Sequence, residues 1–179
     1  MSQAWVRDVL EFWFSHGWDD WWKPSNAFDL EIADRFGQLW EERRENVPEH
    51  FLGSADEALA AVLLFDQMPR NMFRGHADQF STDPLALAVA KGAVERDYDD
   101  GMTPERRGFL YMPFEHSEDL RDQRQALLLF TALGDAEMLK YARLHHDLIA
   151  RFGRFPHRNL MLGRKPTAIE AAAGKVVPW

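Results

Sequence analysis

The sequence repeatedly places a helix-start signal before an apolar run of helical periodicity, and no stretch shows the period-two alternation of a β-strand. Phe28, Ile32, Phe36 and Leu39 recur at spacings of three and four, as residues on one helix face do. The capping residues that precede such runs include Ser54, Thr103, Ser117 and Thr167. We therefore predict an all-α fold of about seven to nine helices, packed as antiparallel hairpins.

The same signals predict where several helices lie. We expect one to end before Gly17, and others over about residues 26–45, 54–65, 84–96, 117–133 and 135–152. The run 58–65 is apolar on every side, which predicts the central buried helix. Pro69 disfavours helical angles at Met68, so we expect the chain to turn there. Asp83, directly before Pro84, is the expected N-cap of the next helix.

Length and composition are typical of one domain. The chain has 179 residues, no cysteine and a formal net charge of −8 at pH 7. Since a chain of this length buries one core without disulfides, we expect a single all-helical domain over residues 1–179. The sequence shows no signal peptide and no membrane-spanning run, which indicates a soluble, cytoplasmic protein without membrane partners. Its negative charge disfavours binding to nucleic acid.

The first polar motif follows the central apolar helix. Asp66, Gln67, Arg70, Asn71 and Arg74 lie close together in the sequence there. One hypothesis is a ligand site in which Arg70, Asn71 and Arg74 hold an anion. The favoured alternative is structural: Asp66 pairs with Arg70, while Gln67 and Asn71 bind backbone groups at the helix end.

The second motif contains Glu115 and His116, followed by Ser117, Glu118 and Asp119. Capping explains the last three, because hydroxyl and carboxylate groups stabilise a helix N-terminus. Glu115 and His116 are not explained in this way. They are candidates for an acid–base pair, whereas a metal site is disfavoured because no His-x-x-x-His or Glu-x-x-His pair occurs here.

The third motif contributes Arg154, His157, Arg158 and Asn159, between Gly153 and Gly163. An arginine keeps its charge and needs water, a carboxylate or a ligand. The expected internal partners are Asp66, Glu115 and Glu118, so we expect the polar motifs to converge in one region. His145 shares a helix face with Ile149 and is interpreted as a hydrogen-bonded core histidine.

The closely spaced tryptophans Trp18, Trp21 and Trp22 predict a segment that folds over the core as a lid. A groove floor or self-association surface is the alternative. No phosphate-binding loop, dinucleotide fingerprint, nucleophile elbow or zinc-protease motif is present, which removes the usual sequence support for the common enzyme classes.

Four ordered blocks resemble a bacterial family, domain of unknown function 924: FDQMPRNMFRG (65–75), TDPLA (82–86), YMPFEHSE (111–118) and RFGRFPHRN (151–159). The opening VLEFWF (9–14) is similar to it as well. The resemblance covers nearly the whole chain and implies a tetratricopeptide-like helical domain. It implies no activity and carries over no catalytic residues.

Three functional hypotheses follow. The leading one is a helical binding module that holds a small anionic ligand or a peptide carboxylate, using Arg70, Asn71, Arg74, Arg154, His157, Arg158 and Asn159. The second is an enzyme in which Glu115 and His116 carry out acid–base or metal-assisted chemistry on an anionic substrate. The third is a purely structural polar cluster. We predict no cofactor and no resident metal.

Overall fold

The computed structural model describes residues 4–176, and within that range the secondary structure is helical with no β-strand. The all-α prediction is therefore confirmed, whereas the tetratricopeptide-like arrangement stays a prediction. The chain divides into two compact units, the first ending at Pro113 and the second beginning at Phe114. The prediction of one domain over residues 1–179 stays a prediction. No helix in the described range has both the length and the apolar character needed to cross a membrane.

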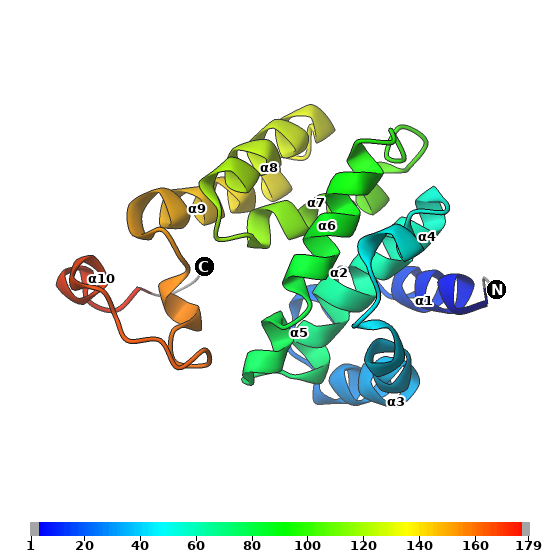
Figure 1. Ribbon diagram of the computed structural model, residues 1–179, viewed down its shortest axis with the longest axis horizontal. Helices are drawn as coiled ribbons and strands as arrows, with labels where there is room; N and C mark the ends of the chain where they lie inside the picture. Colours follow the sequence, from blue (N-terminus) through cyan, green and yellow to red (C-terminus); the bar gives the residue numbers. More distant parts are fainter. Residues whose placement is uncertain (1–3, 177–179) are drawn as a thin grey trace. The chain divides into compact units, whose positions relative to one another are not determined.

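The first unit contains most of the helices (Figure 1). In chain order they are α1 (Ala4–Ser15), α2 (Trp18–Trp22), α3 (Asn26–Arg43), η1 (Pro48–Phe51), α4 (Ala55–Val62), η2 (Leu63–Gln67), α5 (Met68–Met72), η3 (Ala77–Phe80), α6 (Asp83–Val94) and α7 (Pro104–His116), whose last turn belongs to the second unit. Helix α4 packs against α1 and α6, and α3 packs against α5.

Helix α4 and the π-helical segment η2 form the centre of this unit, as the apolar run predicts. Every residue from Ala58 to Asp66 is inaccessible to solvent. Ser54 caps α4, with its hydroxyl accepting a hydrogen bond from the backbone N–H of Glu57. The expected central buried helix is therefore present.

The predicted turn at Met68 is wrong, because the chain stays helical through Pro69. Met68 has φ −58° and ψ −37°, and α5 continues directly from η2. Proline has no N–H to donate to the preceding turn. The carbonyl oxygen of Phe65 instead accepts a hydrogen bond from the hydroxyl of Thr82, at 2.6 Å. A wider turn and a side-chain donor thus accommodate the proline within the helix.

Two predicted caps are also wrong. Asp83 is the first residue of α6 rather than its N-cap, and its carboxylate binds Arg70. Asp119, not Ser117, caps the helix that follows it, by accepting a hydrogen bond from the N–H of Arg121. In both cases the predicted residue lies one or two positions from the true N-cap. Sequence spacing alone does not show which of two such neighbouring residues is the cap.

The tryptophan-rich segment forms α2 and covers part of the core. The ring of Trp21 lies against Phe109, with centroids 5.0 Å apart, and its indole N–H donates to the carbonyl oxygen of Trp13. Trp22 also stacks on Phe109. Trp18 stays 54% exposed. The side chains of Trp21 and Trp22 thus cover Phe109 as the lid hypothesis expects.

The second unit is built on a helical hairpin. Its further elements are α8 (Leu120–Leu133), α9 (Ala136–Phe152), η4 (Pro156–Arg158) and α10 (Ala168–Ala173). Helices α8 and α9 run side by side (Figure 1). Gly134 adopts φ +79°, a left-handed conformation that suits glycine, and Asp135 caps α9. The predicted stop and start at these two residues is confirmed.

Candidate functional site

Two histidines and a glutamate meet in the second unit. Glu115 and His116 are the last residues of α7, and His145 lies within α9. One side-chain donor atom from each lies within 4.8 Å of the other two. Oε1 of Glu115 is 3.9 Å from Nε2 of His116, and the centres of the two histidine rings are 5.7 Å apart. Glu115 and His145 are buried, and His116 is half-buried.

The ring of His145 is neutral and has a defined tautomer. Burial, followed by the charges of His116 and Arg158, lowers the pKa of His145 to about 3. Its Nδ1 lies 2.9 Å from the carbonyl oxygen of Tyr141. Since a carbonyl only accepts, Nδ1 carries the proton and donates it. Nε2 is then the nitrogen with the lone pair, which suits a base or a metal ligand.

A buried glutamine holds the chain just after α7. Nε2 of Gln123 donates to the carbonyl oxygens of Glu115, at 2.6 Å, and Ser117, at 2.7 Å. The last carbonyls of a helix have no partner within it, so these bonds satisfy groups that would otherwise need water. The backbone that carries Glu115 and His116 is thereby tied to α8.

Phe155 links this cluster to two of the residues predicted to bind a ligand. The Phe155 ring lies 5.6 Å from that of His145 and 5.5 Å from that of His157. The guanidinium of Arg158 lies 4.5 Å from the same ring centre, and Arg158 is only 7% exposed. Burial, followed by the charge of Arg158, lowers the pKa of His157 to about 4. The cluster therefore has a buried cation beside it.

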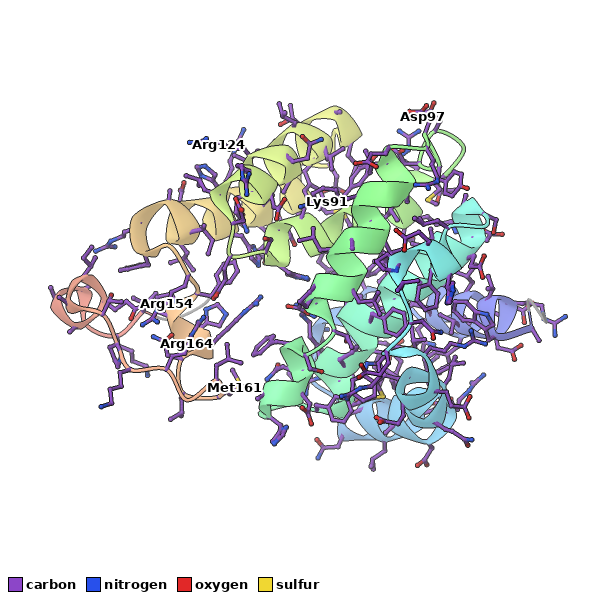
Figure 2. All side chains as sticks on the ribbon, viewed as in Figure 1. Lys91, Asp97, Arg124, Arg154, Met161 and Arg164 are labelled. Atoms are coloured by element: carbon purple, nitrogen blue, oxygen red, sulfur yellow. The ribbon has the colours of Figure 1, made fainter. Side chains whose placement is uncertain are left out.

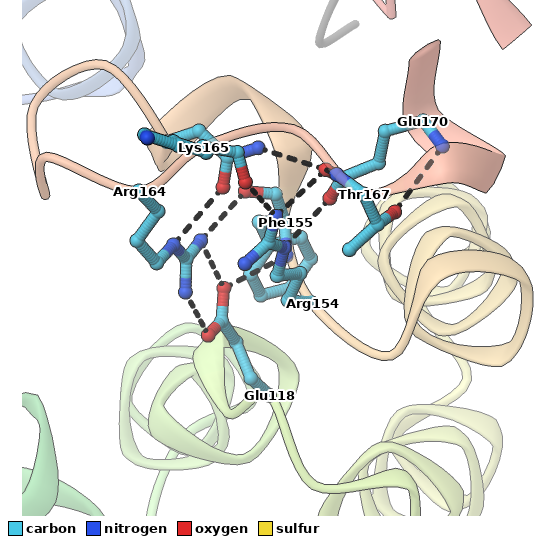
Figure 3. Close-up of polar contacts among 8 residues, drawn as sticks. Glu118, Arg154, Phe155, Arg164, Lys165, Thr167 and Glu170 are labelled. Atoms are coloured by element: carbon cyan, nitrogen blue, oxygen red, sulfur yellow. Dashed lines mark hydrogen bonds and ion pairs between the residues drawn. The ribbon is translucent and has the colours of Figure 1, made fainter. Parts of the chain in front are cut away.

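Arg154 and Asn159, also predicted to bind a ligand, contact a carboxylate of the chain itself. Figure 3 shows the contact of Arg154 with Glu170. Nε and Nη2 of Arg154 donate to the two oxygens of Glu170, at 2.7 and 2.8 Å. Asn159 donates to the same carboxylate at 3.1 Å. The Arg154 bond, together with the backbone N–H of Thr167, lowers the pKa of Glu170 to about 2 despite its burial.

A second ion pair, which is half-buried, lies close by. Arg164 donates through Nη1 and Nη2 to the two oxygens of Glu118, at 2.6 and 3.0 Å, and the backbone N–H of Phe155 adds a third bond. Burial tends to raise the pKa of Glu118, but these hydrogen bonds outweigh it, and the pKa is lowered. Arg154 and Arg164 lie near each other in the C-terminal part of the chain (Figure 2).

Arg70 lies in the first unit and binds two carboxylates. Its Nη1 and Nη2 donate to the two oxygens of Asp83, each at 3.0 Å. Nη1 is also 3.4 Å from Oδ1 of Asp66, so the predicted ion pair between Asp66 and Arg70 is confirmed. The guanidinium thus binds Asp83 through two parallel hydrogen bonds, the same geometry in which it would bind the carboxylate of a ligand.

Asn71 and Arg74 share one carboxylate in the first unit. Asn71 donates to Oδ1 of Asp29 at 2.7 Å, and Arg74 donates to both oxygens of Asp29 at 2.7 and 2.9 Å. Burial tends to raise the pKa of Asp29, but the bonds from Arg74 and Asn71 lower it overall. Ligand binding by these residues stays a prediction, as does the convergence of their motif with the others.

Sequence reasoning did not assign site roles to His145, Arg164 and Glu170. The apolar neighbours of His145 predicted its burial correctly but not its approach to His116. The predicted cap at Thr167 is confirmed and Glu170 completes its capping box, but the pattern does not predict that Glu170 pairs with Arg154. Such pairings join residues far apart in the chain, and no sequence spacing signals them.

A pocket of about 440 Å³ lies next to the Glu170 network. Its walls are formed by Pro156, Asn159, Leu160, Arg164, Pro166, Glu170, Ala171, Gly174 and Val176. The volume is within the usual range for small-molecule sites. Leu160, which is 91% exposed, forms part of its wall.

Comparisons with known proteins identify relatives without an assigned activity. A family model described as bacterial protein of unknown function (DUF924) matches residues 9–173. The structure is similar to that of ATU0120, a protein of unknown function from Agrobacterium tumefaciens, with 40% sequence identity and a TM-score of 0.87. That similarity covers 95% of this chain and 96% of the other. No curated protein matches the chain.

Proposed function

Because this chain belongs to a bacterial family of unknown function, DUF924, we propose its function from the site geometry alone. The protein is an enzyme that acts on a small anionic substrate, and Glu115 and His116 are its reacting groups. This function is supported best by one observation, the convergence of donor atoms from Glu115, His116 and His145 within 4.8 Å. Carboxylate and imidazole groups at this distance are suited to proton transfer.

The contacts of the residues predicted to bind a ligand support catalysis more than simple anion binding. Arg70, Arg74 and Arg154 each bind a carboxylate of the chain, so much of their hydrogen-bonding capacity is already used. His145, in contrast, is held in one tautomer within a buried site. A buried titratable group with a strongly perturbed pKa is a common feature of active sites.

The choice of an anionic substrate rests on Arg158. Its guanidinium is buried beside Phe155 and its charge lowers the pKa of both His145 and His157. The same positive field favours a negatively charged molecule near the histidines. Phosphate esters and carboxylates are the simplest substrates of that kind.

A turnover screen of matched variants tests the proposal. The wild type, Glu115→Gln and His116→Gln would be assayed against p-nitrophenyl phosphate, its diester and a panel of carboxylate esters and dicarboxylates. We expect turnover by the wild type and a loss of about 100-fold or more in both variants. His146→Gln, a change on the neighbouring position of α9, is the control and keeps wild-type turnover. Equal rates in all four proteins would refute the proposal.

The pocket beside Glu170 favours a second candidate function, the binding of a small ligand. Asn159 and Arg164 supply polar groups there, while Pro156, Leu160 and Pro166 supply apolar wall. This combination is typical of small-molecule sites. Of the residues predicted to form a ligand-binding groove, only Asn159 lines this pocket.

Thermal-shift screening with anionic metabolites tests this second candidate, because a ligand that binds the native state raises its melting temperature. Leu160→Trp would fill part of the pocket from its exposed wall, and Leu128→Trp, at an exposed position of α8, is the matched control. A stabilising ligand whose effect disappears only in Leu160→Trp supports the pocket. A shift that Leu160→Trp leaves unchanged places the ligand elsewhere.

A further inference from the structure

We propose that Glu115, His116 and His145 bind one divalent transition-metal ion such as Zn²⁺ or Fe²⁺. The inference rests on the proposed function for its site and goes beyond it by naming the cofactor through which the site acts. It also departs from the sequence-based prediction of no resident metal.

The donor set itself points to this class of metal. Two imidazole nitrogens and one carboxylate oxygen suit zinc, iron, cobalt and nickel, whereas magnesium and calcium prefer oxygen ligands alone. Three protein ligands leave positions for water or substrate, which is the usual composition of a catalytic rather than a structural site. The ligands come from two helices, Glu115 and His116 from the end of α7 and His145 from α9.

The distances allow the three groups to close around an ion. Metal–ligand bonds of about 2.0–2.2 Å place neighbouring ligand atoms roughly 3–3.5 Å apart. The three donor atoms lie within 4.8 Å of one another, and one carboxylate–imidazole pair is already at 3.9 Å. Binding of an ion would therefore have to draw the most distant pair of donor atoms together by roughly 1.5 Å.

The hydrogen bond of His145 is the second, independent observation. A metal-bound histidine nearly always donates its other ring N–H to a carboxylate or a backbone carbonyl, which orients the ring. Nδ1 of His145 makes that bond to the carbonyl oxygen of Tyr141, at 2.9 Å. Nε2 is thereby the coordinating nitrogen, and the ring is oriented before any ion binds.

Burial adds a reason why water does not compete strongly for the ion. Glu115 is 6% exposed and His145 is 9% exposed. A chance cluster of surface groups would be solvated and mobile, whereas these side chains are held by the packing around them. Pre-oriented ligands lose less conformational freedom when an ion binds.

Under this inference Glu115, His116 and His145 would hold the ion, which would supply Lewis-acid chemistry to the site when bound. A bound divalent ion lowers the pKa of its water and polarises phosphoryl or carbonyl oxygens. His116 and His145 then act as ligands rather than as bases. Arg158 keeps its role of favouring a negatively charged substrate.

The test measures metal binding directly, with no substrate present. The full-length chain is stripped with a chelator and titrated calorimetrically with Zn²⁺, and bound metal is counted by elemental analysis. Bound Co²⁺ is followed by its visible absorption. We expect one ion per chain, a raised melting temperature with Zn²⁺ and no effect of Mg²⁺.

Matched variants identify the ligands. Glu115→Gln, His116→Gln and His145→Gln should each weaken Zn²⁺ binding by about 100-fold or more, since even second-sphere changes cost 10–100-fold. His146→Gln, which removes the adjacent histidine of α9, should bind as the wild type does. Wild-type affinity in the His145→Gln variant, or no stoichiometric binding by the wild type, overturns the inference.

A measurement on the wild type covers the case in which a variant fails to fold. The ¹⁵N NMR resonances of Nε2 of His116 and His145 should shift when Zn²⁺ is added, while Nδ1–H of His145 stays protonated. Unshifted Nε2 resonances overturn the inference.

If the stripped protein still turns over substrate in a Glu115-dependent way, the metal inference fails while the proposed function stands. If Zn²⁺ binds as expected but the turnover of all variants equals that of the wild type, the proposed function fails instead.

Discussion

At the scale of single residues, several arginines of this protein form ion pairs with carboxylates of the same chain. Arg70 binds Asp83, Arg154 binds Glu170 and Arg164 binds Glu118, each through two donor nitrogens. Such pairs fix the position of both partners, because the planar fork of the guanidinium matches a carboxylate in one orientation. Their primary effect should therefore be on stability and local order.

Arg154→Ala should lower the melting temperature clearly, because Glu170 is 4% exposed and would lose two of its hydrogen bonds. Arg121→Ala is the matched control. That arginine also pairs with a carboxylate, Asp119, but its side chain is 86% exposed, so its loss should change little. Differential scanning calorimetry of the two variants separates these outcomes. Equal melting temperatures would assign Arg154 a role other than stabilisation.

The depressed pKa of Glu170 predicts acid sensitivity. Its pKa falls from 4.5 to about 2 on folding, so its ion pair stabilises the native state above pH 4.5 and loses that effect as the pH falls towards 2. Glu118, whose pKa is also lowered, acts in the same direction. In urea titrations at several pH values, Glu170→Gln should be less stable than the wild type at pH 7 and approach it at low pH. A constant difference across that range would contradict this assignment.

At the scale of elements, two local devices position the polar groups. The hairpin of α8 and α9 carries His145, and Gln123 of α8 ties the end of α7. In the first unit, the hydroxyl of Thr82 satisfies the carbonyl that Pro69 leaves without its helical partner, and it also accepts a bond from Nε1 of Trp40. The bonds of Thr82 join segments that are distant in the chain, whereas those of Gln123 join neighbouring helices across a short loop.

Asp135→Ala should destabilise the protein by about 1 kcal/mol, the usual cost of losing an N-cap. The Asp135 carboxylate accepts hydrogen bonds from the N–H groups of Glu137 and Met138, both at 3.0 Å. Asp147→Ala, at an exposed site later in α9, is the control and should have a small effect. The midpoints of urea unfolding measure both. If the Asp135→Ala variant were as stable as the wild type, packing alone would determine where α9 begins.

Thr82→Val should cost about 1–3 kcal/mol, because it leaves a buried carbonyl and a buried indole N–H without their partner. Thr82→Ser keeps the hydroxyl and should retain most of the stability. Chemical unfolding of the two variants distinguishes the lost hydrogen bonds from the lost methyl group. If serine proved as destabilising as valine, packing rather than hydrogen bonding would explain the role of Thr82.

At the scale of the whole molecule, composition and charge predict which partners are disfavoured. The chain carries 29 acidic and 21 basic residues, and several arginines are already paired with carboxylates. A nucleic-acid-binding surface needs a cluster of basic groups that neutralise phosphates. We therefore expect the net charge of −8 to disfavour polyanions, even though Arg158 is a local cation.

We accordingly expect no binding to duplex DNA or single-stranded RNA at 50 mM salt or above, where non-specific binders still show affinity. A gel-shift or fluorescence-anisotropy titration at micromolar protein checks this prediction. Salt-dependent binding in that range would mean that the basic groups form a surface patch that the net charge conceals.

The sequence by itself determined the helical class, most helix boundaries and the buried centre. The periodicity of apolar residues, the stop at Gly134 and the caps at Ser54, Asp135 and Thr167 act over a few residues, so their physics is visible in the sequence. The predictions at Pro69 and Asp83 failed because of contacts between separate segments, the bond from Thr82 to Phe65 and the bond from Arg70 to Asp83. At Ser117 the cause is local, since its hydroxyl donates to Asp122 in the following helix.

Only the tertiary structure decided the candidate site. The sequence singled out Glu115 and His116 as unexplained by capping, but it contained no signal that His145 would join them or that Glu170 would pair with Arg154. A spacing rule describes neighbours on one helix, whereas these contacts join separate segments of the second unit: the last turn of α7 with α9, and the segment after α9 with α10. Packing sets those distances, and packing depends on the fit of many side chains at once.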